Sequence, residues 1–126
     1  MTSKAIKRGV RDLTFWWLEG EPPVNGAIAQ ARANICLGCP MNEREAGLDR
    51  LTKAVSRRVR AALASKHEMK LELIDEDKLG LCEACGCSLK LKPWTPKSVI
   101  WKHGTPDYFW ELDERCWIRS EDPLKP

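Results

Sequence analysis

The chain has 126 residues, a formal net charge of +3, 43% hydrophobic residues and 31% charged residues. This is the size and composition of one folded domain, which excludes a disordered tail and a two-domain enzyme. No apolar run is long enough to predict a membrane span, and the N-terminal residues lack the apolar core of a signal peptide. The mild basic excess is far below that of a dedicated nucleic-acid-binding protein. We therefore expect one small domain that folds in a reducing compartment.

The first predicted element is an N-terminal arm or short helix over residues 1–25. It combines several basic residues with the apolar run Phe15-Trp16-Trp17-Leu18. Gly20, Pro22 and Pro23 then interrupt regular structure, because glycine and proline are the strongest local breakers.

A second helix should begin after Asn25, which is a good N-cap residue, and continue through Ile35. Cys36 follows this helix directly and is the first residue of a CxxC turn that includes Cys39. Pro40 closes the turn, since proline cannot continue a preceding helix without cost.

The clearest helical pattern spans residues 48–63, where apolar side chains recur at helical spacing and basic side chains fill the other positions. An acidic segment follows at residues 72–77, so the two segments can neutralise each other. Farther along, Leu89 and Leu91 alternate with Lys90 and Lys92, which predicts a short strand.

These elements predict a small domain of helices and irregular structure, α+β at most, with two or three helices around a cysteine-bound metal that staples the fold. The predicted organisation is an arm at residues 1–25 followed by a single cysteine-rich domain at residues 26–126. Residues 43–78 form a basic helical excursion from that domain.

The six cysteines carry the main functional signal. In a reducing compartment, cysteines in a regular pattern bind metal more often than they form disulfides. Each CxxC turn supplies half of a tetrahedral thiolate site, and a glycine lies in or next to each turn. The sequence therefore predicts a metal centre with six candidate ligands: Cys36, Cys39, Cys82, Cys85, Cys87 and Cys116.

The number of thiolates leaves the metal open. Four cysteines could bind one zinc ion and leave two spare, four could hold a [4Fe-4S] cluster, or six could share two zinc ions through bridging sulfurs. The segment between the CxxC turns exceeds the roughly 15 to 20 residues of a compact zinc ribbon. This spacing weakens the zinc-ribbon assignment but not the metal assignment.

Two other groups of residues suggest binding surfaces. A basic helix face could lie against nucleic-acid phosphates, although a solvated face is the commoner explanation. Its residues are Arg50, Lys53, Arg57, Arg58 and Arg60. Among the six tryptophans, Trp16, Trp17 and Trp110 are predicted to anchor an interface, because large rigid rings bury much area at low entropic cost. No nucleophile–base pair, phosphate loop or zinc-protease motif is present, so we expect no enzymatic activity.

The order CxxCP, then CxxCGCxLKxKxW, then CW resembles small cysteine-rich proteins of tailed bacteriophages and prophages. The matching stretches are residues 32–42, 79–96 and 115–118. The chain differs from the usual pattern in its insert at residues 43–78 and in lacking a proline and a Lys-Trp pair around the last cysteine, Cys116. The resemblance implies a virion-associated protein with a structural metal site, and iron–sulfur clusters have precedent in phage tail-tip proteins.

The expected function is therefore a structural component of a phage particle, in the tail, baseplate or neck, stabilised by zinc or a [4Fe-4S] cluster. The resemblance implies assembly in the host cytoplasm, localisation in the virion and other virion proteins as partners. Nucleic acid is a less favoured partner, and neither a membrane nor a small-molecule substrate is expected. Two alternatives are a zinc-stabilised nucleic-acid-binding regulator that uses the basic helix, and an iron–sulfur redox protein.

Overall fold

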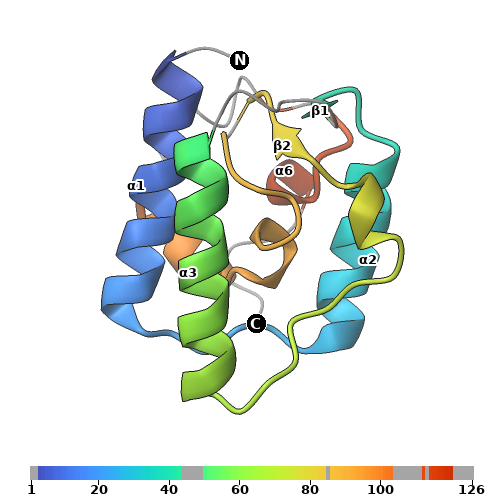
Figure 1. Ribbon diagram of the computed structural model, residues 1–126. Helices are drawn as coiled ribbons and strands as arrows, with labels where there is room; N and C mark the ends of the chain where they lie inside the picture. Colours follow the sequence, from blue (N-terminus) through green and yellow to red (C-terminus); the bar gives the residue numbers. More distant parts are fainter. Residues whose placement is uncertain (1–2, 44–49, 85, 104–111, 113, 121–126) are drawn as a thin grey trace.

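The computed structural model describes residues 3–43, 50–84, 86–103, 112 and 114–120. The fold is small and mostly helical, with one two-stranded sheet, in agreement with the coarse prediction (Figure 1). Its elements in chain order are α1 (Ser3–Glu19), α2 (Gly26–Leu37), β1 (Asn42–Glu43), α3 (Arg50–Lys66), the 3-10 turn η1 (Glu76–Lys78), β2 (Leu81–Cys82), the 3-10 turn η2 (Lys92–Trp94), α4 (Lys97–His103) and α6 (Trp117–Ser120).

Helices α1 and α3 lie side by side and share an apolar interface (Figure 1). Leu13 and Trp16 of α1 are buried, as are Val59 and Leu63 of α3. Burial of each large apolar side chain contributes about 1.5 to 3 kcal/mol, so this face holds the two helices together. The helix predicted over residues 48–63 is confirmed from Arg50 onward, since residues 48 and 49 lie outside the described residues, and Val59 and Leu63 of its apolar stripe are buried.

Helix α2 is also confirmed, together with its N-cap. The Asn25 side chain accepts a hydrogen bond of 2.9 Å from the Ile28 backbone N–H, which satisfies one of the exposed donors of the first turn. The buried face of the helix consists of Ala29, Arg32, Ala33 and Cys36. The prediction that this helix delivers the chain to Cys36 is therefore correct.

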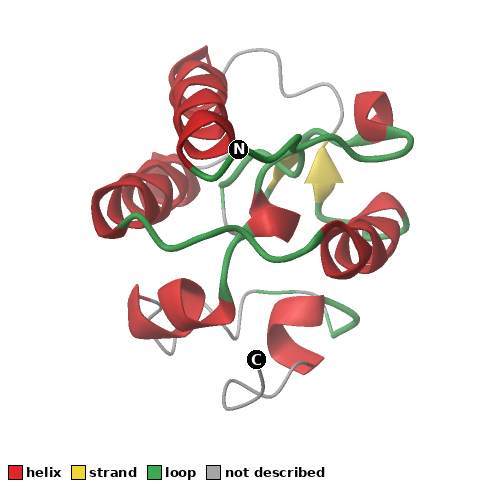
Figure 2. Cartoon of the chain, turned by 90° about the horizontal axis from the view of Figure 1, so that it is seen from below, coloured by secondary structure: helices red, strands yellow, loops and turns green. Residues whose placement is uncertain are grey.

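An irregular segment, with helices around it, occupies the centre of the molecule (Figure 2). Every residue from 86 to 96 is buried except Lys90. The short strand predicted from the alternation of Leu89 and Leu91 with lysines is wrong, because this stretch turns into η2 and buries Lys92 as well. The turn is held by the Ser88 carbonyl, which accepts hydrogen bonds from the Leu91 and Lys92 N–H groups at 3.1 and 2.9 Å. These turn hydrogen bonds and Pro93 end the extended backbone that alternation requires, so Lys92 falls on the buried side.

Strands β1 and β2 pair antiparallel, with Asn42 opposite Cys82 and Glu43 opposite Leu81. The Asn42 side chain reinforces the pairing, since its Oδ1 accepts from the Gly80 N–H at 2.9 Å and its Nδ2 donates to the Lys78 carbonyl at 3.1 Å. This small sheet brings the first CxxC turn beside the second cysteine cluster. Within the described part of the chain, no helix has the length and apolar character needed to cross a membrane.

Candidate metal centre

The first two cysteines lie at the C-terminal end of α2. Cys36 is buried in the last turn of the helix, and Cys39 is half-buried in the turn that follows. The turn is tight, because the Cys39 N–H donates to the Cys36 carbonyl at 3.1 Å and the Asn42 N–H donates to the Cys39 carbonyl at 3.1 Å. Both sulfurs are therefore carried on a short, well-bonded piece of backbone.

Cys82 ends β2 and begins the second cysteine turn. The Gly86 N–H donates to the Cys82 carbonyl at 2.7 Å, and the Cys82 N–H donates to the Cys87 carbonyl at 3.0 Å. Gly86 has a φ of +72°, a left-handed conformation that glycine adopts without steric cost. The positive φ that glycine allows in such a turn is thus found at Gly86, whereas Gly38 in the first CxxC turn has a φ of −95°.

Four cysteines from three distant segments line one small cavity of about 20 Å³: Cys36, Cys39, Cys82 and Cys116. The rest of the wall is mainly apolar and consists of Ile35, Met41, Asn42, Leu89, Lys92, Leu112, Trp117 and Ile118. Cys116 reaches the cavity although its surrounding sequence departs from the phage-protein pattern. The tertiary structure thus gathers four of the six predicted ligands.

These four cysteines could serve as the thiolate ligands of a metal ion. The cavity that they line has room for about one water-sized sphere. Within the described residues, which do not include Cys85, no three Cys, His, Asp or Glu side chains already stand close enough together to hold a metal. Ion binding would therefore draw the sulfurs inward toward the usual zinc–sulfur distance of about 2.3 Å.

Cys87 lies beside this cavity but does not line it. Its Sγ is 3.8 Å from the Gly9 carbonyl oxygen of α1, which accepts from the thiol, and 3.7 Å from the Lys92 Nζ, which donates to the sulfur. These contacts describe a buried cysteine that helps to dock α1 on the second cysteine turn. Cys85, the remaining predicted ligand, lies outside the described residues.

Three residues around the cysteines were not predicted from the sequence as site residues. The Trp117 Nε1 donates to the Cys36 Sγ at 3.3 Å, and the Arg32 guanidinium stacks over the Trp117 ring at 4.3 Å from its centroid. Lys92 lines the cavity and is 1% exposed. The only available signals were the position of Trp117 next to a cysteine and the presence of a lysine between apolar residues.

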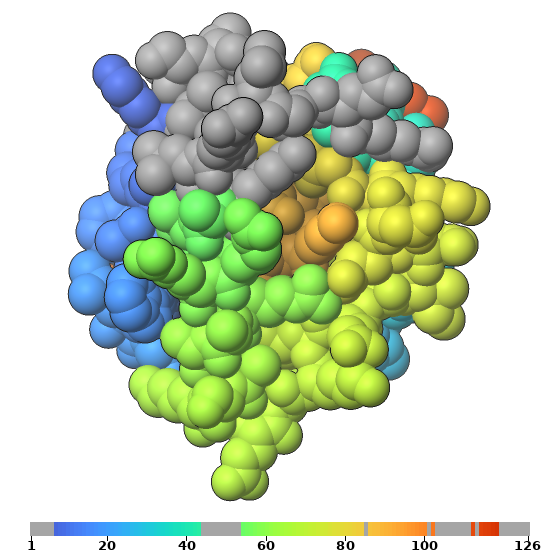
Figure 3. Space-filling view, viewed as in Figure 1, coloured from blue at the N-terminus to red at the C-terminus, as the bar shows by residue number. Residues whose placement is uncertain are grey.

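The predicted basic surface is only partly available for binding. Arg57 and Arg58 are exposed on α3, whose outer face is green in Figure 3. Arg60 instead pairs with Glu76 at 2.7 Å and also donates to the Leu71 carbonyl, so it joins α3 to the acidic segment. The side chains of Arg50 and Lys53 lie outside the described part of the molecule.

The predicted interface tryptophans separate into different environments. Trp16 is wholly buried, and its Nε1 donates to the Glu21 carbonyl at 2.9 Å, so it belongs to the core and the prediction of an interface role for it is corrected. The physical reason is helical periodicity, which turns Trp16 into the core and leaves Trp17 56% exposed. Trp110 lies outside the described residues.

Comparison with known proteins identifies no matching protein family, no curated relative and no similar solved structure.

Proposed function

We propose that the protein is a structural metal-binding protein in which cysteine thiolates hold one zinc ion. The observation that carries this proposal is the convergence of Cys36, Cys39, Cys82 and Cys116 on one small cavity. Thiolates are the preferred ligands of structural zinc, and four of them complete a tetrahedral site with no open position for a substrate. The ion would join the end of α2, the second cysteine turn and the segment that leads into α6.

The biological setting we propose is a phage particle, in the tail, baseplate or neck. The resemblance of the cysteine and lysine pattern to small phage proteins supports this setting. A metal-stapled fold suits a small virion protein, because metal binding can contribute about 10 to 16 kcal/mol in finger peptides, comparable to the net stability of a whole domain. Other virion proteins would be its partners, and mass spectrometry of purified particles should then detect its peptides.

Elemental analysis of anaerobically purified protein, combined with an absorption spectrum, tests the metal centre. We expect one zinc per chain and no visible absorption. About four irons with broad absorption in the visible range would mean a [4Fe-4S] cluster in place of zinc and would favour the resemblance to phage tail proteins. Protein that is folded and free of both metals would overturn the proposal.

Serine variants identify the ligands. Cys36→Ser and Cys82→Ser should lose zinc, whereas Cys87→Ser should retain it, because Cys87 lies outside the cavity. Cys116→Ser should also lose zinc, because Cys116 is the fourth cysteine that lines the cavity. Retention of a full zinc complement by Cys36→Ser would contradict the site as proposed.

The nucleic-acid alternative is tested separately by reversing the charge of the two exposed arginines on α3. If the protein binds DNA or RNA with strong salt dependence, Arg57→Glu combined with Arg58→Glu should weaken that binding and reduce its salt dependence. Unchanged mobility shifts in the double variant would argue against the basic helix as a contact surface.

A further inference from the structure

Buried cations gather around the second cysteine turn and the cavity. Of the charged residues that the structure places in buried positions, Arg8, Arg32 and Lys92 are cations and Asp12 is an anion. Removing a charged group from water costs several kcal/mol unless compensating contacts surround it. The position of these cations therefore points to negative or strongly accepting groups in the same region.

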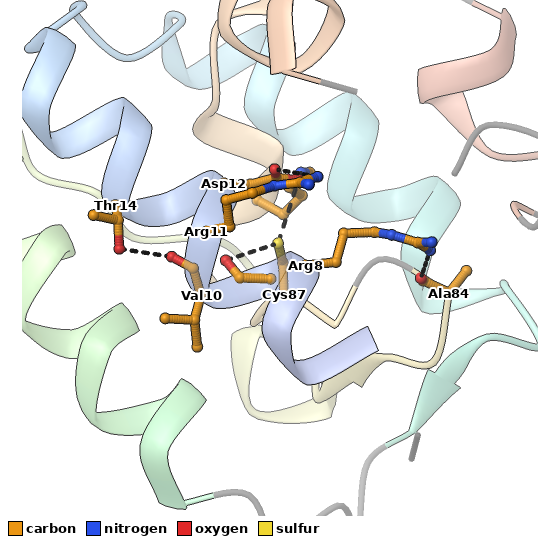
Figure 4. Close-up of polar contacts among 9 residues, drawn as sticks. Arg8, Val10, Arg11, Asp12, Thr14, Ala84 and Cys87 are labelled. Atoms are coloured by element: carbon orange, nitrogen blue, oxygen red, sulfur yellow. Dashed lines mark hydrogen bonds and ion pairs between the residues drawn. The ribbon is translucent and has the colours of Figure 1, made fainter. Parts of the chain in front are cut away.

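Each cation is directed toward the cysteine-bearing backbone or its neighbours. Arg8 of α1 donates to the Ala84 carbonyl at 3.0 Å, inside the second cysteine turn (Figure 4). Arg32 of α2 donates to the carbonyls of Pro93 and Thr95 at 3.0 and 2.8 Å and stacks on Trp117. Arg8 thus holds the second cysteine turn, and Arg32 packs on Trp117, which lines the cavity.

Of the three buried cations, Lys92 is the one with a side-chain contact to a cysteine sulfur. Its Nζ is 3.6 Å from the Asp12 Oδ2 and 3.7 Å from the Cys87 Sγ, and its side chain lines the cavity of the four cysteines. Asp12 and Cys87 also lie near each other in Figure 4. A lysine head group is a compact charge with three donors, so one ammonium can serve several acceptors at once.

Trp117 supplies a neutral donor to the same site. Its indole N–H has no accepting ability and points at the Cys36 Sγ at 3.3 Å. A hydrogen bond to sulfur is stronger when the sulfur is a thiolate than when it is a thiol, because charged acceptors form the stronger bonds. The indole therefore donates directly to a sulfur that the proposed metal site would use.

We infer that Lys92 and Trp117 form an outer shell that stabilises the thiolate centre, with Arg32 positioning the Trp117 ring. This inference rests on the proposed metal site. Four thiolates carry more negative charge than one divalent ion carries positive charge, so the loaded centre would be an anion. The Lys92 ammonium, from η2, and the Trp117 N–H, from α6, would stabilise that negative charge. Lys92 and Trp117 are thus positioning residues for the metal rather than ligands of it.

Titration of metal-free protein with Co(II) tests this inference, because tetrahedral cobalt thiolates report both affinity and sulfur environment by absorption. The informative variants are Lys92→Met, which preserves volume, and Trp117→Phe, which removes the N–H but keeps a ring under Arg32. Lys90→Met is the matched control, since Lys90 is exposed, lies two positions away and does not line the cysteine cavity.

We expect both variants to bind Co(II) about 10- to 100-fold more weakly than the unaltered protein, the usual effect of losing an outer-shell partner. We also expect the sulfur-to-cobalt charge-transfer band to move to lower energy, because sulfur lone pairs that lose a nearby donor or cation are held less tightly. A purely structural role would weaken the fold without moving this band. Lys90→Met should match the unaltered protein in both measurements.

The outcomes separate this inference from the proposed function. If the unaltered protein takes up neither Co(II) nor Zn(II), the metal centre itself is refuted. If it binds Co(II) but both variants keep its affinity and its band, the centre stands and the outer shell is refuted. If Lys92→Met does not fold, Trp117→Phe decides the question alone by the same two measurements.

Discussion

The Trp117 Nε1 donates a hydrogen bond of 3.3 Å to the Cys36 Sγ, although the two residues are 81 positions apart in the chain. The contact ties α6 to the end of α2 at the wall of the cysteine cavity. Trp117 is 2% exposed, so its ring fills the space between these elements while its polar edge meets sulfur. Trp117 and Cys36 therefore belong both to the apolar core and to the wall of the candidate metal site. A substitution at either residue should alter both the stability of the fold and the binding of metal.

Arg32 should be one of the residues most sensitive to substitution. It is 2% exposed, and Arg32→Met removes the donors to the Pro93 and Thr95 carbonyls and the stacking on Trp117. Buried carbonyls left without donors are costly, so we expect a loss of about 3 kcal/mol in the free energy of unfolding. Urea denaturation measures it. Arg58→Met, on an exposed part of α3, should change stability by less than about 0.5 kcal/mol.

Gly9 should not tolerate a side chain. A Cβ at this position would overlap the Gly86 carbonyl and approach the Cys87 N at 2.9 Å, and both groups belong to the backbone of the second cysteine turn. Gly9→Ala should therefore push α1 away from that turn and cost about 1 to 3 kcal/mol or more. Thermal unfolding is the measurement. A stable Gly9→Ala protein would show that the approach of α1 to the turn is looser than described.

Gly26→Ala is the matched control for Gly9→Ala. Gly26 begins α2, and the atom nearest to a new Cβ is in the Trp94 ring at an ordinary 3.8 Å. Alanine reduces the entropy of the unfolded chain and favours the helix, so stability should rise by about 0.4 to 1 kcal/mol. A loss of stability in Gly9→Ala with a gain in Gly26→Ala would show that the cost at Gly9 comes from close packing and not from a general effect of replacing glycine.

Zinc should stabilise the protein according to its occupancy. At a free zinc concentration 100 times the dissociation constant, the free energy of unfolding should rise by about 2.7 kcal/mol, and a strong chelator should reverse the gain. Cys36→Ser should abolish the zinc-dependent gain, and Cys87→Ser should preserve it. An equal gain in Cys36→Ser would mean that zinc acts elsewhere on the chain.

The ion pair between Arg60 and Glu76 should stabilise the packing of α3 against the segment that follows it. The two side chains meet at 2.7 Å and are about a quarter exposed, and Glu76 also accepts from the Leu73 N–H at 3.3 Å. Solvent screening reduces the attraction, so a double-mutant cycle with Arg60→Met and Glu76→Gln should give a coupling of about 1 kcal/mol.

The pair Lys70–Glu72 provides the comparison for this cycle. Its side chains are 80% and 64% exposed, and their charged atoms lie 3.4 Å apart. Flexible, hydrated side chains gain little from such a contact, so the coupling should be close to zero. Equal couplings in the two cycles would contradict a structural role for the Arg60–Glu76 pair.

The sequence by itself determined the local elements of this protein. Helical spacing of apolar residues identified α3, the Asn25 cap identified the start of α2, and glycine marked the knuckle at Gly86, because these signals depend on neighbours within a few residues. The CxxC pattern also named Cys36, Cys39 and Cys82, three of the four cysteines that line the cavity. The sequence was enough to predict these features because each depends on the conformation of a few neighbouring residues.

Only the tertiary structure decided which side chains surround the cysteines and which residues are buried. Trp16 and Trp17 are chemically the same, yet Trp16 belongs to the core and Trp17 is exposed, because only one face of α1 turns toward the rest of the domain. Lys92 sits in a segment that reads as an alternating strand, but enclosure by helices turns it into a buried cation beside the cavity. The separation of Cys87 from Cys36, Cys39, Cys82 and Cys116 likewise depends on contacts between distant segments, whose partners no local pattern specifies.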